Sequence, residues 1–252
     1  TLGGLTVEQF DFPILAAEAG VSAQQAMTAR TILTQLALSN ADWGSNTIQV
    51  DGGLLPSGHN WKTGSTGIGT EQGPNILVSL QYAARIIHQA VIGAFNPRRM
   101  TLVVNPTTAM AMRASSEINN YIRESPFALA QLRGDSPNQN GAWGLPTRLY
   151  EFDLVVEDTV KITSKRGAQT TSYNYAMPDG VAYLLARQGE LVGVQGSRTY
   201  STVQVFFYRD ELTTYLKNDV DNLRYLGRVV SNYQPVTVTT AAGFMFTNIL
   251  GS

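Results

Sequence analysis

One segment, residues 100–156, most constrains what this chain can fold into. It opens with the apolar run Met100–Val104, breaks at Asn105-Pro106, and closes at Trp143–Pro146 before the alternating Tyr150, Phe152, Leu154 and Val156. Asparagine is favoured as a helix N-cap and proline at the first helical position, so the break predicts the start of a helix. The segment is therefore expected to run strand, helix, loop, turn and strand. It contains no catalytic signature.

Two longer helices are predicted from the spacing of apolar side chains. The first, residues 22–38, begins with a capping box and then repeats alanine and leucine every three to four residues. A shorter helix should precede it around residues 10–18, interrupted near Pro13 and ended by Gly20. The second long helix is expected over residues 74–93, where a broad apolar stripe suits packing on a sheet.

After Pro146 the chain is rich in strand signals. A short helical turn and a strand both fit residues 212–216. Alternating or β-branched runs predict a hairpin with its tip at 165–167 and strands over 150–156, 180–186, 202–207 and much of 223–246. The order of elements indicates an α+β chain with a domain excursion between about Gly58 and Gly196.

Composition excludes several kinds of site. The 252 residues include no cysteine and two histidines, which removes disulfide and thiolate chemistry and leaves little for a metal. The net charge of -1 predicts no global attraction to nucleic acid or anionic membrane, and no apolar run is long enough to span a bilayer. Charged residues make up 15% of the chain, which fits a surface that meets other protein and equally a surface of uncharged polar side chains.

Tests for chemistry give no enzyme hypothesis. The glycine-rich residues 52–73 lack the lysine and glycine spacing of phosphate-binding loops, and no serine has the context of a nucleophile elbow. The carboxylate pairs Glu151/Asp153 and Asp219/Asp221 are expected on solvated strand faces. We therefore expect no catalytic residue, no cofactor and no metal site.

The chain resembles the major capsid proteins of tailed bacteriophages, the group with the Hong Kong 97 fold. The resemblance is carried by residues 22–38 with the lead-in Ala16–Gly20, by Asn105-Pro106 with Trp143-Gly144-Leu145-Pro146, and by residues 215–235. It implies a peripheral domain with a long spine helix and long β-strands, and an axial α/β domain. The implied boundaries are 1–57 (peripheral, first part), 58–196 (axial) and 197–252 (peripheral, returning strands).

The chain departs from the family in two respects. The family's N-terminal arm and extended hairpin loop precede the spine helix. Either these segments lie upstream of Thr1, outside this sequence, as we expect, or this member has lost them. Some members join a lysine of that loop to a peripheral-domain asparagine with the help of a glutamate. Asn218 stands at the matching position, but the glutamate position falls on Tyr225 and the loop is not present, so no cross-link is expected at Asn218.

The resemblance implies a structural protein of the virion, assembled in the host cytoplasm. Its partners would be further copies of itself in pentamers and hexamers, with portal, scaffolding and decoration proteins as possible additional partners. The shell would enclose DNA without sequence-specific binding and would involve no membrane. Asn105, Pro106, Trp143, Gly144 and Pro146 would form rigid turns. A loop at the capsomer axis would contain Arg133, Gly134, Asp135, Asn138, Asn140 and Gly141.

Two alternatives remain at this level. An encapsulin-type nanocompartment shell shares the fold and encloses protein cargo in place of DNA. A soluble hydrolase or binding module would use the loops between Gly52 and Gly73. Particle imaging distinguishes both from a phage capsid.

Overall fold

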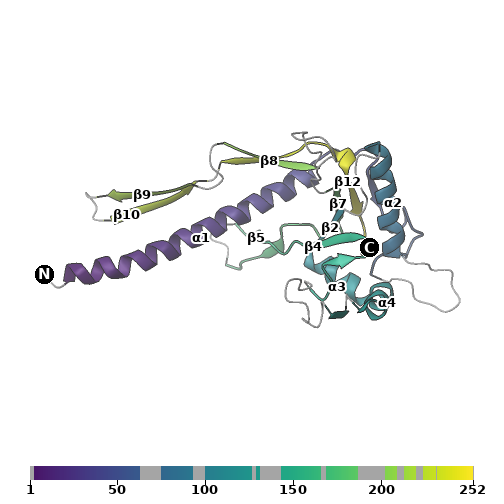
Figure 1. Cartoon of the computed structure of the whole chain (residues 1–252), viewed down its shortest axis with the longest axis horizontal. Coiled ribbons are helices and arrows are strands. Elements are labelled where there is room, and N and C mark those ends of the chain that lie inside the picture. The colour runs from purple at the N-terminus through teal and green to yellow at the C-terminus, as the bar shows by residue number, and fades with distance from the viewer. Residues whose placement is uncertain are drawn as a thin grey trace. The chain divides into compact units, whose positions relative to one another are not determined.

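The chain divides into two compact units, each described here by itself. The computed structural model describes residues 3–62, 75–92, 100–126, 129–130, 143–165, 169–186, 202–208, 213–219, 224–230 and 232–251, without the side chains of 3–19, 214–219 and 224–229. The smaller unit combines residues 1–39 with 204–236, and the larger combines 40–203 with 237–252. Figure 1 labels many of the elements of both units.

A six-stranded mixed sheet forms the centre of the larger unit. Strand β2 runs parallel to β4 and antiparallel to β7, and β1 runs parallel to β12. Residues from both ends of the unit's sequence therefore meet in one sheet. The strand order is β1 (Thr47–Gln49), β12 (Gly243–Thr247), β7 (Ala182–Ala186), β2 (Met100–Val104), β4 (Phe152–Val156) and β3 (Arg148–Leu149).

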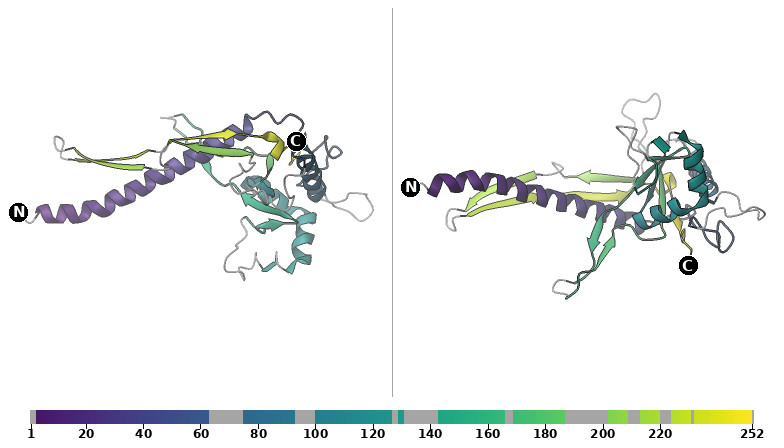
Figure 2. Two further views of the ribbon diagram at one scale, coloured as in Figure 1. Left: turned by 45° about the horizontal axis from the view of Figure 1, so that its top comes forward. Right: turned by 90° about the horizontal axis from the view of Figure 1, so that it is seen from below.

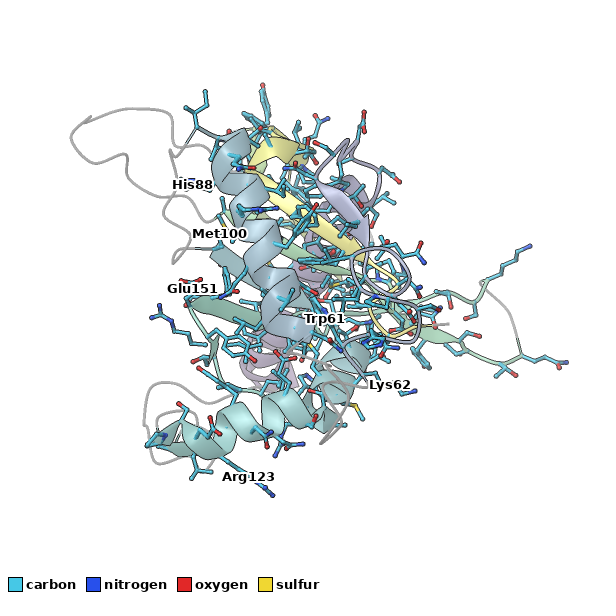
Figure 3. All side chains as sticks on the ribbon, turned by 90° about the vertical axis from the view of Figure 1, so that its right-hand side faces the viewer. Trp61, Lys62, His88, Met100, Arg123 and Glu151 are labelled. Carbon is cyan, nitrogen blue, oxygen red and sulfur yellow. The ribbon has the colours of Figure 1, made fainter. Side chains whose placement is uncertain are left out.

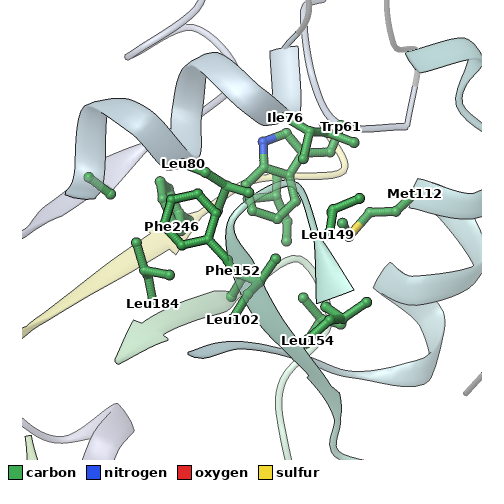
Figure 4. Packing of buried hydrophobic residues seen from close by; sticks show 14 of the residues in the cluster. Trp61, Ile76, Leu80, Leu102, Met112, Leu149, Phe152, Leu154, Leu184 and Phe246 are labelled. Carbon is green, nitrogen blue, oxygen red and sulfur yellow. The ribbon is translucent and has the colours of Figure 1, made fainter. Parts of the chain in front are cut away.

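The core lies on one face of this sheet. The pairing register places Leu154, Leu102, Leu184 and Phe244 in one row across β4, β2, β7 and β12, and all four belong to the buried cluster. Figure 4 shows Ile76 and Leu80 of α2 (Asn75–Ala90) packed over that cluster with Trp61. Burying one large apolar side chain stabilises the fold by about 1.5–3 kcal/mol, so this row and α2 together hold the sheet.

Two short helices follow β2. Helix α3 (Pro106–Ala114) is separated from α4 (Ser116–Glu124) by Ser115, whose hydroxyl accepts a hydrogen bond from the Ile118 N–H and whose own N–H bonds to the Met112 carbonyl. Both helices contribute side chains to the core, among them Met112 and Ile118. The 3-10 helix η2 (Thr240–Ala242) precedes β12.

A hairpin of β5 (Val160–Ile162) and β6 (Tyr173–Tyr175) forms a sheet of its own within the larger unit. Figure 2 shows it projecting from the strands and helices around it. The hairpin that the sequence predicts is therefore present, while residues 166–168 at its tip lie outside the described residues. Among the described strands, β5 pairs only with β6.

The smaller unit contains one long helix and two antiparallel ribbons. Helix α1 spans Gly3–Ser39 and packs on β10. One ribbon pairs β9 (Thr213–Asp219) with β10 (Arg224–Val230). The other pairs β8 (Val203–Phe207) with β11 (Tyr233–Thr237). The end residues Val203 and Thr237 of this second ribbon belong to the larger unit. Across the described residues, no helix combines the length and hydropathy that crossing a membrane requires.

Several expectations from the sequence need correction. Helix α1 is continuous through Pro13 and Gly20, where two helices were expected. A glycine inside a helix costs only about 1 kcal/mol, which the alanine-rich neighbours of Gly20 offset. Tyr150 lies in a turn with φ 54 and not in a strand, so Glu151 also precedes β4. For residues 212–216, where a helical turn and a strand both fitted the sequence, the strand is confirmed, as residues 213–219 form β9.

The two compact units are divided differently from the boundaries 1–57, 58–196 and 197–252, which stay a prediction about the peripheral and axial domains. Strands β1 and β12, expected in the two outer parts, are hydrogen-bonded into the sheet that contains β2, β4 and β7. The smaller unit is accordingly reduced to 1–39 and 204–236. The reason is the parallel pairing of Thr47–Gln49 with Met245–Thr247, a contact between the two ends of the unit's sequence.

Candidate assembly surfaces

Asn105 fixes the junction between β2 and α3. It is fully buried, and its side-chain oxygen accepts a hydrogen bond of 2.8 Å from the Thr108 N–H, with Pro106 at the start of the helix. The Asn105 amide group also donates to the carboxylate of Asp179, which lies just before β7. The predicted cap is thus present, and the same side chain ties the start of α3 to a second segment.

Trp143 and Gly144 form a turn with positive φ angles of 56 and 75. A Cβ on Gly144 would lie at an ordinary contact distance of 3.4 Å from the Arg113 side chain, so this position suits glycine because of its φ. Pro146 is buried, whereas Trp143 keeps 44% of its surface exposed. A large aromatic side chain held outward by a constrained backbone is suited to contact with another molecule.

Glu117 joins three segments of the larger unit. Its carboxylate accepts hydrogen bonds from the backbone N–H groups of Ile76 and Leu77 at the start of α2, at 2.8 and 2.9 Å, and from the Tyr150 hydroxyl at 2.7 Å. A negative charge at a helix N-terminus is favourable. Burial, and then the hydrogen bond to Glu117, hold the pKa of Tyr150 well above its ordinary value. The Tyr121 hydroxyl accepts the Tyr150 N–H at 3.2 Å and completes the network.

The predicted axis loop cannot be placed. Arg133, Gly134, Asp135, Asn138, Asn140 and Gly141 all lie outside the described residues. The position of Asn218 is described for its backbone, which pairs in register with Tyr225 across the β9–β10 ribbon. The residue at the family's glutamate position is therefore the direct cross-strand neighbour of Asn218, and tyrosine offers no carboxylate there.

In the smaller unit, Arg30 of α1 lies against the inner face of the β8–β11 ribbon. Its guanidinium carbon is 4.7 Å from the ring centre of Phe207 and 5.9 Å from that of Tyr233. Such contacts contribute roughly 0.5–2 kcal/mol each. Burial raises the pKa of the Tyr233 phenol, and the positive charge of Arg30 opposes that shift. Arg30 therefore links α1 to both strands of the ribbon.

The outer face of the same ribbon is uncharged and exposes aromatic and aliphatic side chains beside the amide side chains of Asn232 and Gln234. The Tyr208 N–H bonds to the Asn232 carbonyl at 3.0 Å, which sets a register in which Phe206 lies opposite Gln234. Phe206, Tyr208 and Val236 are 55%, 69% and 37% exposed. Exposed aromatic side chains of this density on one face are typical of protein–protein contact surfaces.

The β5–β6 hairpin presents a second open apolar surface, in the larger unit. Val160, Ile162 and Tyr173 are 48%, 65% and 62% exposed, and the register places Ile162 directly opposite Tyr173. A hollow of about 540 Å³ lies at the root of the hairpin, where Thr107, Lys161, Tyr175, Met177 and Asp179 contribute to its lining.

Within the described ranges, no group of three or more His, Asp and Glu residues is placed to hold a metal ion. His88 lies exposed in the last turn of α2, as Figure 3 shows. The carboxylates of the Glu151/Asp153 pair fall on different elements, since Glu151 is in the turn and Asp153 is in β4.

Comparison with solved structures identifies a shared fold. A phage-related protein from Bordetella bronchiseptica RB50 superposes with a TM-score of 0.63 over 94% of this chain and 68% of its own, at 11% sequence identity. The two proteins share one mixed α and β fold. The resemblance to a phage fold, inferred from the sequence, is confirmed at this level. No family model matches the chain, and no curated protein matches it.

Two more distant structures also match. The capsid of cyanophage P-SCSP1u has a TM-score of 0.41 at 13% identity and covers 80% of this chain and 53% of its own. A candidate prophage capsid protein from E. coli CFT073 has a TM-score of 0.38 at 11% identity and covers 75% of this chain and 50% of its own. At these scores the likeness is too weak to support an argument about this chain.

Sequence reasoning did not find the residues that form the two open surfaces. The sequence places Phe206 and Tyr208 in or beside a strand. Arg30, far away in the sequence, covers the opposite face of that strand, and the sequence does not show this contact. Glu117 was also missed, because its partners Ile76 and Leu77 are 41 and 40 residues away. Ser115, a residue type favoured as an N-cap, is followed by Ile118 and Ile122 at helical spacing, and this pattern could have indicated α4.

Proposed function

We propose that this chain is the structural subunit of a tailed-phage capsid, a major capsid protein that assembles with copies of itself into pentamers and hexamers of a closed icosahedral shell around double-stranded DNA. The observation that carries the proposal is the fold shared with the phage-related protein over 94% of the chain. That fold follows the order of elements implied by the sequence resemblance: a long helix, a mixed α/β unit and returning strands.

The open surfaces support assembly as the function. The outer face of the β8–β11 ribbon and the β5–β6 hairpin expose aromatic and β-branched side chains. Burial of these side chains against another subunit would favour association. They lie on different units, one on each. Identical subunits close into rings through head-to-tail contacts between two different patches, and such contacts need more than one surface of this kind.

In this proposal the smaller unit, with α1 and the two ribbons, corresponds to the peripheral domain, and most of the larger unit corresponds to the axial domain. The segment from Arg133 to Gly141 would lie where several copies meet at a symmetry axis. A loop with few charges suits that place, because like charges brought together by symmetry repel one another. Asn105-Pro106 and Trp143–Pro146 would be the rigid turns on either side of it.

The proposed role is structural and not enzymatic. The interactions that define the described residues are caps, aromatic contacts and open apolar faces, and these serve folding and association. With a net charge of -1, a shell built from this chain would enclose DNA without binding it tightly. The protein would reside in the virion, after assembly in the host cytoplasm.

The test is to express the chain and measure its assembled state by light scattering coupled to gel filtration, followed by electron microscopy of the fractions. We expect closed particles far above the 27.4 kDa monomer mass. A monodisperse species at 27.4 kDa that forms no particles would contradict the proposal. Particles isolated from their natural source should contain DNA. Particles filled with a protein cargo would instead identify a nanocompartment shell.

A further inference from the structure

We propose that the outer edge of β8, the edge that faces away from β11, pairs with the same edge of a second copy of this chain. The two strands run antiparallel and the pair is centred on Phe206. This inference rests on the proposed function, because it assigns one of the contacts through which copies meet. It adds the strand, the register and the symmetry of that contact.

The register of the β8–β11 ribbon determines which backbone groups face outward. At one end the Tyr208 N–H bonds to the Asn232 carbonyl at 3.0 Å. At the other end the Val238 N–H bonds to the Thr202 carbonyl, also at 3.0 Å. The spacing between these two bonds is equal on both strands, so no bulge interrupts the ladder. Even-numbered residues are therefore hydrogen-bonded across the ribbon, and odd-numbered residues point their N–H and C=O groups outward.

The two outer edges of the ribbon differ. On β11 the middle outward-facing residue is Pro235, which has no N–H to donate. On β8 the residue directly opposite is Val205, and Val205 and Phe207 both present an N–H and a C=O to the edge. Among the described strands, β8 pairs with β11 alone. Proline and charged side chains are usual protections of an exposed edge, so β11 is protected and β8 is open to a further strand.

The composition of β8 favours a partner strand like itself. Residues 202–208 include no charged side chain, and Val205, Phe206 and Phe207 are residue types favoured in strands. A charged strand would lose solvation against this edge without gaining an ionic partner. Phe206 is 55% exposed and Tyr208 is 69% exposed, so aromatic surface is available for contact. The matching partner is an uncharged strand rich in aromatic and β-branched residues, and β8 is such a strand.

Paired with itself, β8 makes a symmetric set of contacts. When Phe206 lies opposite Phe206 of the second copy, Val205 of each copy meets Phe207 of the other, which gives about four backbone hydrogen bonds. Gln204 then lies opposite Tyr208. Phe206 falls in a non-hydrogen-bonded pair, where side chains lie closest and aromatic residues interact favourably. The two ribbons become one four-stranded sheet with Pro235 on both outer edges.

The size and symmetry of this contact suit an assembly of many copies. A stable interface takes about 800 Å² from each partner, supplied by roughly 20–30 residues, whereas only residues 204–208 of each copy meet here. The contact is therefore too small to hold two free copies together and fits copies that other contacts already bring close. Rings form through head-to-tail contacts, while a two-fold contact of like with like can join subunits of adjacent rings.

The absence of native cysteine permits a direct test by disulfide trapping. Phe206→Cys places two thiols opposite each other with about 4.5 Å between Cα atoms, within the range of a disulfide. Particles of this variant are oxidised and run on a non-reducing gel, and a dimer band is expected. Gln204→Cys is the matched control on the same face of the same strand. Its two copies lie about 13 Å apart along the pair and should give no dimer.

A pair of cysteines tests the register with Phe206 in place. Gln204→Cys combined with Tyr208→Cys should give a dimer, because these two positions lie opposite each other between copies. Within one copy they are about 13 Å apart along the strand, too far to form a disulfide. Tyr208→Cys alone should give no dimer.

Val205→Pro tests whether the contact is made through the backbone. It removes an outward N–H from β8 and gives this edge the protection that β11 has from Pro235. Combined with Phe206→Cys it should abolish the dimer band. Val205→Ala keeps the N–H and, as the matched control, should retain the band. Amide exchange of Tyr208, whose N–H bonds within the ribbon, reports whether the ribbon is intact in both variants.

Charge variants test whether the partner is a second copy. Phe206→Lys and Phe206→Glu, each alone, should raise the protein concentration at which particles appear by about fivefold, because like charges then lie directly opposite each other. An equal mixture of the two variants should lower that concentration again, since opposite charges can meet. Mixing would not relieve a folding defect.

The outcomes separate the β8 contact from the shell. Particles that form normally, give no dimer with either cysteine arrangement and tolerate Phe206→Lys would overturn the contact and leave the capsid function standing. A dimer from Gln204→Cys alone would overturn the proposed register. Slow amide exchange at Val205 and Phe207 in particles that give no dimer would assign the edge to a different strand and overturn the second copy as partner. Dimers trapped from a chain that never forms particles would support the contact and contradict the shell.

Discussion

Two buried polar residues, Asn105 and Glu117, determine how the helices of the larger unit begin. Each accepts hydrogen bonds from backbone N–H groups in the first turn of a helix, and each also reaches a side chain from a different segment. The Asn105 cap was predictable because Thr108, its hydrogen-bond partner in α3, is close in sequence. The link to Asp179 and the whole Glu117 network depend on contacts 29 to 74 residues apart, which no local pattern encodes.

Asn105→Asp should destabilise the larger unit by about 1–2 kcal/mol, although aspartate is normally as good an N-cap as asparagine. The reason is that the new carboxylate faces Asp179 and can no longer donate a hydrogen bond to it. Urea unfolding followed by tryptophan fluorescence measures this unit specifically, because Trp43, Trp61 and Trp143 all belong to it.

The paired control for that variant is Asn105→Asp combined with Asp179→Asn, which restores one donor and one acceptor. Most of the lost stability should return. If the double variant is as unstable as the sum of the two single variants, the Asn105–Asp179 contact does not contribute as argued.

Tyr150→Phe should show a characteristic pH dependence. In the folded protein the pKa of Tyr150 is raised above its ordinary value of 10.0, so below pH 10 the folded and unfolded states bind the same proton and the stabilisation is fully present. Above pH 10 the unfolded state loses that proton first, and the stabilisation decreases by about 1.4 kcal/mol per pH unit.

The measurement is the difference in unfolding free energy between wild type and Tyr150→Phe from pH 7 to 11. The difference should be constant up to about pH 9, at about 1 kcal/mol for the lost hydrogen bond, and shrink above pH 10. A difference that stays constant through pH 11 would show that Tyr150 titrates alike in both states.

Among the elements, the ribbon of β8 and β11 depends on its contact with α1. Arg30→Ala removes the cation from the faces of Phe207 and Tyr233, which should weaken local stability by about 1–2 kcal/mol. Amide hydrogen exchange of Tyr208, whose N–H bonds to Asn232, should accelerate about five- to thirtyfold. Gln24→Ala, at an exposed position on the same helix, is the control. Equal exchange in both variants would refute the link.

The elements themselves were largely predictable where the pattern is strong and local. The apolar stripe of α2 and the run Met100–Val104 match the observed helix and strand closely. The polar sequence of α4 hid a helix whose buried side is formed mainly by Ile118 and Ile122. Tyr150 fits strand alternation by residue type, but its backbone is turned by the Tyr121 and Glu117 contacts, which the sequence does not display.

At the scale of the whole molecule, the boundaries between units could not be inferred from composition. The pairing of Thr47–Gln49 with Met245–Thr247 joins segments about 198 residues apart, and both segments belong to the larger unit. The order of elements along the chain was predictable, and the resemblance that it supports agrees with the fold found by structural comparison.

Deletion of residues 137–141 tests the proposed axis loop. The variant should remain soluble and folded, because the buried core cluster and the Glu117 network lie elsewhere in the chain. Closed shells should form poorly. Circular dichroism confirms the fold, and electron microscopy scores the particles. Normal shells from the deletion variant would show that the role assigned to this loop is wrong.

The central claim, that this chain builds a closed shell from copies of itself, is tested most directly by a cryo-electron microscopy reconstruction of the purified particles. We predict an icosahedral shell in which the larger units surround the five- and six-fold axes, with residues 133–141 nearest each axis. A chain that remains at 27.4 kDa under all assembly conditions, or a particle without closed symmetry, would contradict it.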